Sequence, residues 1–221
     1  VPLITDEGRT RYLFVQRLCK RLLDLSILAL GSIVIVPVCL VTAALIKLTS
    51  KGPVFFKQKR ALYKGGPEFD VYKFRSMCVD ADNMKKDLLK ENETNGALFK
   101  MKNDPRITPV GHIIRKLSLD EFPQFINVLK GEMSVVGPRP LPVNDYKMIK
   151  NTDKLCFDWY KKRGQAVPGI TGLWQISGRS ELSFEEMCLL DLYYIENQSV
   201  FFDLEIMFDT ACVMVMGAGA Y

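Results

Sequence analysis

Histidine is nearly absent from this sequence, since His112 is the only one among 221 residues. The six cysteines are scattered and include no Cys-x-x-Cys pair. Structural zinc sites and disulfide frameworks are built from such sets, so their absence argues against both. The cysteine pattern favours a reducing compartment instead.

Acidic residues are missing between Asp24 and Glu68, a stretch that carries six lysines and arginines. Basic residues are missing after Arg179, where eight acids follow. A basic front half predicts an anionic partner such as a lipid surface or a phosphate-bearing substrate, and a solvated basic face is the alternative. We expect no nucleic-acid partner.

Charge of either sign is missing from Leu25 to Ile46, a run of 22 mostly apolar residues. As a helix this run is about 33 Å long, close to the thickness of a bilayer's hydrocarbon core. Pro37 near its middle predicts a kink. Basic residues flank both ends, whereas a spanning helix normally has its Lys/Arg excess on one side. The pattern favours a re-entrant helix broken at Pro37; a kinked single span and a buried soluble helix are the alternatives.

Beyond this run, the segments 54–60 and 69–75 have strand character, and the turn residues between them predict a hairpin. Alternation places Lys73 and Arg75 on one face of the second strand. Residues 182–194 are predicted to continue a helix that begins at 177–179. Residues 201–215 are mostly apolar with three acids interspersed, and Phe201, Leu204, Phe208 and Ala211 fall on one stripe at helical spacing. This pattern favours an interfacial amphipathic helix, with burial in the core as the alternative. We therefore expect an α+β fold that is mostly helical, with a small β element.

Residues 110–130 show helical periodicity in two pieces, with a break at 118–121. Ser118 and Glu121 match a capping box. If Asp120 were the cap instead, Pro123 would lie harmlessly in the first turn. Both registers place Asp120 and Glu121 at the start of a helix.

This pair of carboxylates could carry chemistry. The positive end of a helix favours an ionised Asp120, the form that a nucleophile needs, and it also attracts phosphate. Glu121 offers the hard oxygen ligands that suit Mg²⁺, and Arg115 could neutralise a phosphoryl oxygen. An ordinary helix start is the alternative interpretation.

Two further segments are candidates for phosphate binding. In Gly-Pro-Arg-Pro, prolines on both sides hold Arg139 in extended geometry, which lowers the entropy of presenting its guanidinium. The segment 168–179 has three glycines within ten residues, and these allow backbone N–H groups to approach an anion closely. Trp174 could stack on a base and Arg179 could reach a pyrophosphate. A rigid loop and structural side chains are the alternatives.

Several stretches together resemble the bacterial sugar transferase family, the monotopic phosphoglycosyl transferases. They are Tyr72–Met77, Asn103–Arg106, Arg115–Glu121, Val136–Pro140, Pro168–Arg179 and Asp191–Tyr194. The resemblance runs from about Lys20 to Tyr221, and its details are similar to large undecaprenyl-phosphate galactose or glucose phosphotransferases. It implies a re-entrant membrane helix over 17–50, a cytosolic catalytic domain over 51–221, and a segment 1–16 that links to further N-terminal domains.

The resemblance also implies a reaction. The family transfers a sugar-1-phosphate from a UDP-sugar to undecaprenyl phosphate in two steps, through a phosphosugar–aspartate intermediate, with Mg²⁺, at the bacterial inner membrane. UMP is released and surface polysaccharide assembly begins; a homodimer is left open. Matched onto this chain, the catalytic and metal-binding pair is Asp120 and Glu121, the phosphate contacts are Arg115, Arg139, Lys73 and Arg75, and the nucleotide region holds Gly169, Thr171, Gly172, Gln175 and Arg179.

Overall fold

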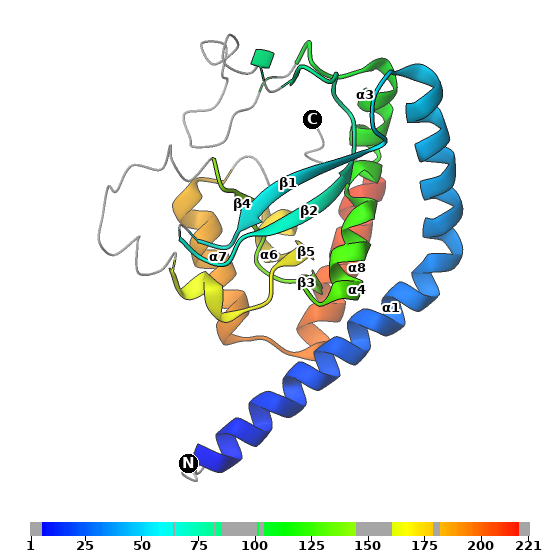
Figure 1. The fold of residues 1–221 in the computed structure, drawn as a ribbon. Helices are drawn as coiled ribbons and strands as arrows, with labels where there is room; N and C mark the ends of the chain where they lie inside the picture. Colours follow the sequence, from blue (N-terminus) through cyan, green and yellow to red (C-terminus); the bar gives the residue numbers. More distant parts are fainter. Residues whose placement is uncertain are drawn as a thin grey trace.

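The computed structural model describes residues 6–63, 65–81, 83–84, 101, 104–144, 161–178 and 182–216. A long N-terminal helix leans against a globular part made of short helices and two small sheets (Figure 1). The elements are α1 (Asp6–Thr49), β1 (Phe55–Ala61), β2 (Phe69–Phe74), α3 (Pro109–Lys116), η2 (Leu119–Gln124), α4 (Phe125–Lys130), β3 (Ser134–Val136), β4 (Leu141–Pro142), η4 (Arg163–Gln165), β5 (Gly169–Thr171), α6 (Leu173–Ser177), α7 (Phe184–Glu196) and α8 (Val200–Met216). The expectation of a mostly helical fold with a small β element is confirmed.

Helix α1 remains helical through Pro37. Figure 1 shows that it is bent and that the outside of the bend faces away from the globular part. The predicted break is thus a bend within one continuous helix. Residues 15–49 are long and apolar enough to cross a membrane, with a mean hydropathy of 2.6 over their most apolar stretch and only 11% of that stretch buried.

Both ends of the apolar run are fastened to the globular part. Near its start, Asp24 accepts hydrogen bonds from Ser134 Oγ and the Val135 amide, both at 3.0 Å. Near its end, Ile46 is buried in a cluster with Phe74 and Ile114. The exposed apolar side chains of α1 lie mainly between these attachments, and they include Leu30, Ile33, Val34, Val36, Leu40 and Val41.

The predicted hairpin is present as an antiparallel pair of β1 and β2, and β4 adds a short third strand on the other side of β1. On the unpaired edge of β2, backbone groups hydrogen-bond with the side chain of Asn127, which lies on α4. Asn127 accepts a hydrogen bond from the Tyr72 amide at 3.1 Å and donates one to the Asp70 carbonyl at 2.7 Å. This arrangement pairs the backbone groups that a strand edge would otherwise leave open.

The segment 109–130 breaks where the sequence predicts, but the capping box is wrong. Ser118 adopts the left-handed conformation, with φ of 53°, and its side chain makes no capping hydrogen bond. The chain therefore turns sharply between α3 and η2, and η2 is a 3-10 helix that contains Pro123. Asp120 and Glu121 lie in its first turn, as both predicted registers require.

The C-terminal helices differ from the prediction at one point. Ser177 and Gly178 do not begin a helix, because α6 ends at Ser177 and Gly178 follows with φ of 152°. Helix α7 begins after Ser183, which forms a capping box with Glu186. Helix α8 is confirmed, and the predicted apolar stripe, from Phe201 to Ala211, is exposed to solvent rather than buried. Its opposite face packs on the core through Ile206.

Candidate active site

Asp120 and Glu121 lie beside two cations that come from distant parts of the chain. Lys73, on β2, places its Nζ 2.9 Å from Glu121 Oε1 and 3.5 Å from Asp120 Oδ2. Arg139 places Nη2 2.5 Å from Glu121 Oε1 and Nη1 3.3 Å from Oε2. All four side chains are between 15% and 20% exposed, so the cluster is largely buried but still accessible to solvent. The structure thereby brings together four of the residues predicted from sequence.

The electrostatics of the cluster keep Glu121 ionised. Its burial raises the pKa of the carboxyl, but the charges and hydrogen bonds of Arg139 and Lys73 outweigh that effect and hold the pKa well below its usual range. For Arg139, burial lowers the pKa and the Glu121 charge raises it, with a net increase. Two carboxylates and two cations balance in charge, so a diphosphate approaching this cluster would add uncompensated negative charge.

The backbone around Arg139 is held by the segment that the sequence suggested for a nucleotide. The Gly137 amide donates to the Thr171 carbonyl at 2.9 Å, and the Gly169 amide donates to the Pro138 carbonyl at 3.0 Å. A Cβ on Gly169 would lie 2.1 Å from the Gly137 nitrogen, and a Cβ on Gly172 would lie 2.4 Å from the Gly137 oxygen. These glycines therefore permit two backbones to pack together, which supports the loop of Arg139.

Other residues of the predicted nucleotide region have the following surroundings. The Thr171 hydroxyl lies 2.8 Å from that of Thr210 on α8, and Gln175 donates to the Ile170 carbonyl at 3.1 Å. The indole N–H of Trp174 is buried and has no hydrogen-bond partner among the described residues. Arg179 lies outside the described residues.

Arg75 is not part of the cluster. Its guanidinium donates to the Lys51 carbonyl at 2.6 Å and to the Ser50 carbonyl and hydroxyl at 3.2 and 2.8 Å, all at the C-terminal end of α1. Gly52 allows this wrap, because its φ is 121° and a Cβ there would lie 2.9 Å from Arg75 Nη1. Strand β2 ends at Phe74, so the alternation that would put Lys73 and Arg75 on one face does not extend to Arg75. Lys73 therefore contacts the carboxylates, whereas Arg75 contacts the segment after α1.

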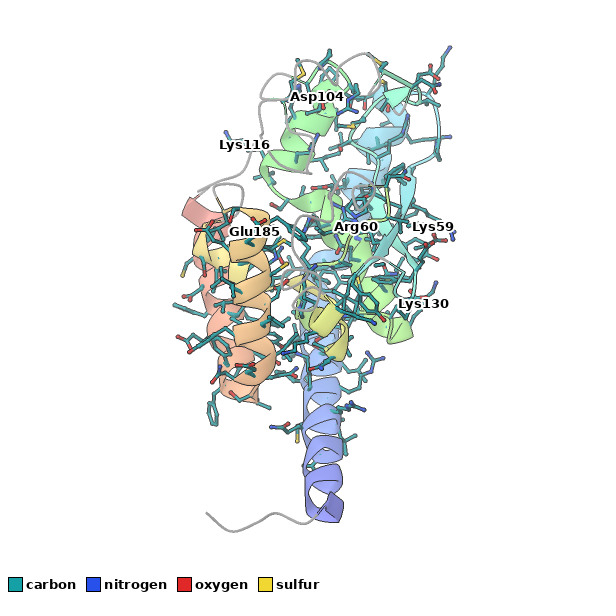
Figure 2. All side chains as sticks on the ribbon, turned by 90° about the vertical axis from the view of Figure 1, so that its left-hand side faces the viewer. Lys59, Arg60, Asp104, Lys116, Lys130 and Glu185 are labelled. Carbon is teal, nitrogen blue, oxygen red and sulfur yellow. The ribbon has the colours of Figure 1, made fainter. Side chains whose placement is uncertain are left out.

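Arg115 also lies apart from the carboxylates. It lies near Asp104, whose pKa its charge helps to lower after the larger effect of Arg106. Among the described residues, the Arg115 side chain makes no hydrogen bond or ion pair with Asp120 or Glu121. Figure 2 shows Asp104 at the far end of the globular part, beside α3. The sharp turn after α3 is the reason, because it ends the helical register that would have stacked Arg115 on the carboxylates.

Sequence reasoning missed two residues that support the cluster. Arg163 is fully buried, and its guanidinium binds both the Asp191 carboxylate and the Arg139 carbonyl. Asn127 fixes β2, and hence Lys73, against α4. A lone Arg or Asn carries no sequence signal for burial. Of the residues involved, only Asp191, the partner of Arg163, lies in one of the family motifs, Asp191–Tyr194.

A divalent cation fits the donors that are present. No group of three or more His, Cys, Asp or Glu side chains able to hold a metal occurs among the described residues. Mg²⁺ is commonly bound through one or two carboxylates, with water and substrate phosphates completing its shell. Asp120 and Glu121 meet that requirement, although Arg139 and Lys73 already bind the Glu121 oxygens.

An apolar helix of membrane-spanning length is joined here to a globular part in which a carboxylate pair lies beside Lys73 and Arg139, and this combination defines a class of membrane-associated protein. The profile described as bacterial sugar transferase matches residues 15–217. The chain therefore belongs to the bacterial sugar transferase family, whose members are enzymes. Membership and the apolar helix together indicate membrane association.

Individual relatives agree with this assignment. The chain is 44% identical to the galactosyl transferase CpsE of Streptococcus agalactiae, covering 95% of this chain and 45% of that protein. It is 36% identical to the exopolysaccharide production protein ExoY of Rhizobium meliloti, covering 92% of this chain and 88% of ExoY. It is 41% identical to the UDP-glucose:undecaprenyl-phosphate glucose-1-phosphate transferase of Klebsiella pneumoniae, covering 94% and 42%. The chain thus spans less than half of two of these relatives.

Proposed function

We propose that this chain transfers a sugar-1-phosphate from a UDP-sugar to undecaprenyl phosphate, giving a polyprenyl-diphosphate sugar and UMP. The observation that carries the proposal is the pair Asp120 and Glu121 at a helix start, bound by Lys73 and Arg139. The printed names of relatives that act on UDP-glucose or undecaprenyl phosphate support the substrate classes.

The proposed reaction has two displacements at the phosphorus next to the sugar. In the first, an Asp120 oxygen bonds to that phosphorus while its bond to the bridging oxygen breaks, and UMP leaves with the bond electrons. In the second, an oxygen of undecaprenyl phosphate bonds to the phosphorus and the bond to Asp120 breaks. Asp120 is thus regenerated, which is the property of covalent catalysis through a carboxylate.

The residues around Asp120 have distinct roles in this proposal. Lys73 contacts both carboxylates, so it can move toward phosphoryl oxygens as negative charge accumulates there. Arg139 keeps Glu121 ionised and oriented. Mg²⁺, held by Asp120 and Glu121, would neutralise phosphoryl charge when bound. Arg115, Arg179 and the segment 169–175 remain proposed contacts of the phosphates and the nucleotide.

We further propose that α1 is re-entrant and that the globular part lies on the cytoplasmic face of the bacterial inner membrane. The argument is the attachment of both ends of the apolar run to one charged globular part, at Asp24 and at Ile46. If α1 simply spanned the bilayer, the part of the globular domain that joins Asp24 to Ile46 would have to lie in the hydrocarbon, where its charged groups are unfavourable. The exposed stripe of α8 remains a proposed interfacial surface, and a homodimer stays open.

The test is UMP release from a panel of UDP-sugars, with membranes that contain the chain, Mg²⁺ and undecaprenyl phosphate. Asp120→Asn should abolish UMP release and any covalent phosphosugar adduct, because the amide is a poor nucleophile. Glu185→Gln, an exposed acid on α7, is the control and should keep full activity. An adduct on the Asp120 variant would exclude Asp120 as the nucleophile. Binding of a UDP-sugar by the wild type without any UMP would favour a binding module.

A further inference from the structure

Arg163 is the largest fully buried side chain of the described residues. Its guanidinium donates hydrogen bonds to backbone carbonyls, one of them in the loop that carries Arg139. Its Nη2 donates to the Arg139 carbonyl at 2.7 Å, and its Nη1 donates to the Leu62 carbonyl at 3.0 Å. Its Nε donates to Asp191 at 2.8 Å. A guanidinium presents donors in a fixed planar fork, so these three partners become fixed relative to one another.

Asp191 makes this burial possible. Its carboxylate is 1% exposed and stands within hydrogen-bond distance of both Nε and Nη2 of Arg163. An isolated guanidinium in a protein interior is strongly unfavourable, whereas a paired and hydrogen-bonded one is tolerated. Asp191 lies on α7, so the pair connects this helix to the loop that carries Arg139.

The loop of Arg139 is held at each of its consecutive carbonyls. The Pro138 carbonyl accepts from the Gly169 amide, the Arg139 carbonyl accepts from Arg163, and the Pro140 carbonyl accepts from Arg60 at 2.9 Å. Figure 2 shows Arg60 in the middle of the globular part. The backbone at position 139 therefore has little freedom, which fixes the point from which the Arg139 side chain reaches Glu121.

We infer that Arg163, held by Asp191, is a positioning residue that fixes the backbone of Arg139 and so keeps the Arg139 guanidinium on Glu121. It touches neither carboxylate of the reacting pair, and it acts only through Arg139. The kinetic part of this inference rests on the proposed function, whereas the positional part does not.

The positional part is tested by hydrogen exchange in the full chain. Arg163→Met removes the donors but keeps an apolar side chain of similar length. We expect the amides of Gly137 and Gly169, which donate to the Thr171 and Pro138 carbonyls, to exchange at least about tenfold faster, because local opening of the loop becomes easier when its hydrogen bond to Arg163 is lost. Unchanged exchange there would overturn the inference, whether or not the chain transfers any sugar phosphate.

The kinetic part is tested by a double-mutant cycle on UMP release. Arg163→Met should lower kcat by on the order of 10²-fold with little change in the KM for the UDP-sugar, because a small misplacement near the reacting atoms affects the chemical step most. In a chain that already carries Arg139→Met, the same change should lower kcat by less than about threefold. Independent, multiplying effects would show that Arg163 does not act through Arg139.

Two more variants separate positioning from folding. Arg163→Met with Asp191→Leu removes both buried charges together, which is often tolerated where loss of one partner is not. This pair should restore the Tm while kcat stays low; recovery of kcat would overturn the inference. Lys20→Met breaks the buried ion pair with Asp203 at 2.6 Å and is the control. It should lower the Tm but leave kcat and the exchange of the Gly137 and Gly169 amides unchanged. A similar loss of kcat in this control would reduce Arg163 to a general structural role.

Discussion

Lys73 gives the sharpest test of the electrostatics described above. Lys73→Met removes a partner that lies 2.9 Å from Glu121 and 3.5 Å from Asp120, in a cluster only 15% to 20% exposed. A hydrogen bond to a charged group contributes about 1.5–3 kcal/mol, and the contact to Glu121 is the shorter of the two. We therefore expect a loss of about 2 kcal/mol at neutral pH, which corresponds to a Tm lower by about 4–8 °C.

The dependence on pH distinguishes this loss from a packing defect. Because the pKa of folded Glu121 is held well below its ordinary value of 4.5, its contribution to stability is present above that value and disappears as the pH falls through the folded pKa. Without Lys73 the folded pKa moves back toward the ordinary value. The variant should consequently lose less stability on acidification than the wild type does.

The measurement is the Tm of the detergent-solubilised chain at neutral pH and near pH 4, for the wild type and the Lys73→Met variant. Lys57→Met is the matched control, because Lys57 is an exposed lysine on the neighbouring strand β1 and contacts the Tyr72 ring. It should shift the Tm only slightly and leave the pH profile unchanged. Parallel profiles for the wild type and the Lys73 variant would refute the reasoning, since they would mean that Lys73 does not affect the pKa of Glu121.

Three further predictions concern the way α1 and the core are held. Arg75→Met should destabilise the chain by about 2 kcal/mol, because it removes the cation from the Ser50 and Lys51 carbonyls that directly follow α1. Gly52→Ala should lower the Tm through the same contact, with a combined effect smaller than the sum. Tyr194→Phe should remove about 1–3 kcal/mol, measured as a lower Tm, because a buried hydroxyl at 2.7 Å from an acid on α8 is lost. In a chain without its native cysteines, R17C and K51C should be labelled from the same side of the membrane, and labelling from opposite sides would replace the re-entrant arrangement with a span.

The sequence determined the features that depend on local pattern. The apolar run, the hairpin, the two helical pieces around 118–121 and the helix near the C-terminus were each readable from periodicity and turn residues, because these depend on neighbours along the chain. The placement of Asp120 and Glu121 in a first helical turn was readable for the same reason. The family was readable because each of its motifs is a short contiguous stretch of the sequence.

Only the tertiary structure decided which cations serve the carboxylates. Lys73, Arg75, Arg115 and Arg139 have the same charge, and all four were candidates for phosphate contact. The end of β2 at Phe74 directs Arg75 to α1, and the left-handed turn at Ser118 leaves Arg115 near Asp104, whereas long-range packing brings Lys73 and Arg139 to Glu121. The buried pair of Arg163 and Asp191 is of the same kind, because burial depends on what packs around a side chain and not on its neighbours in the sequence.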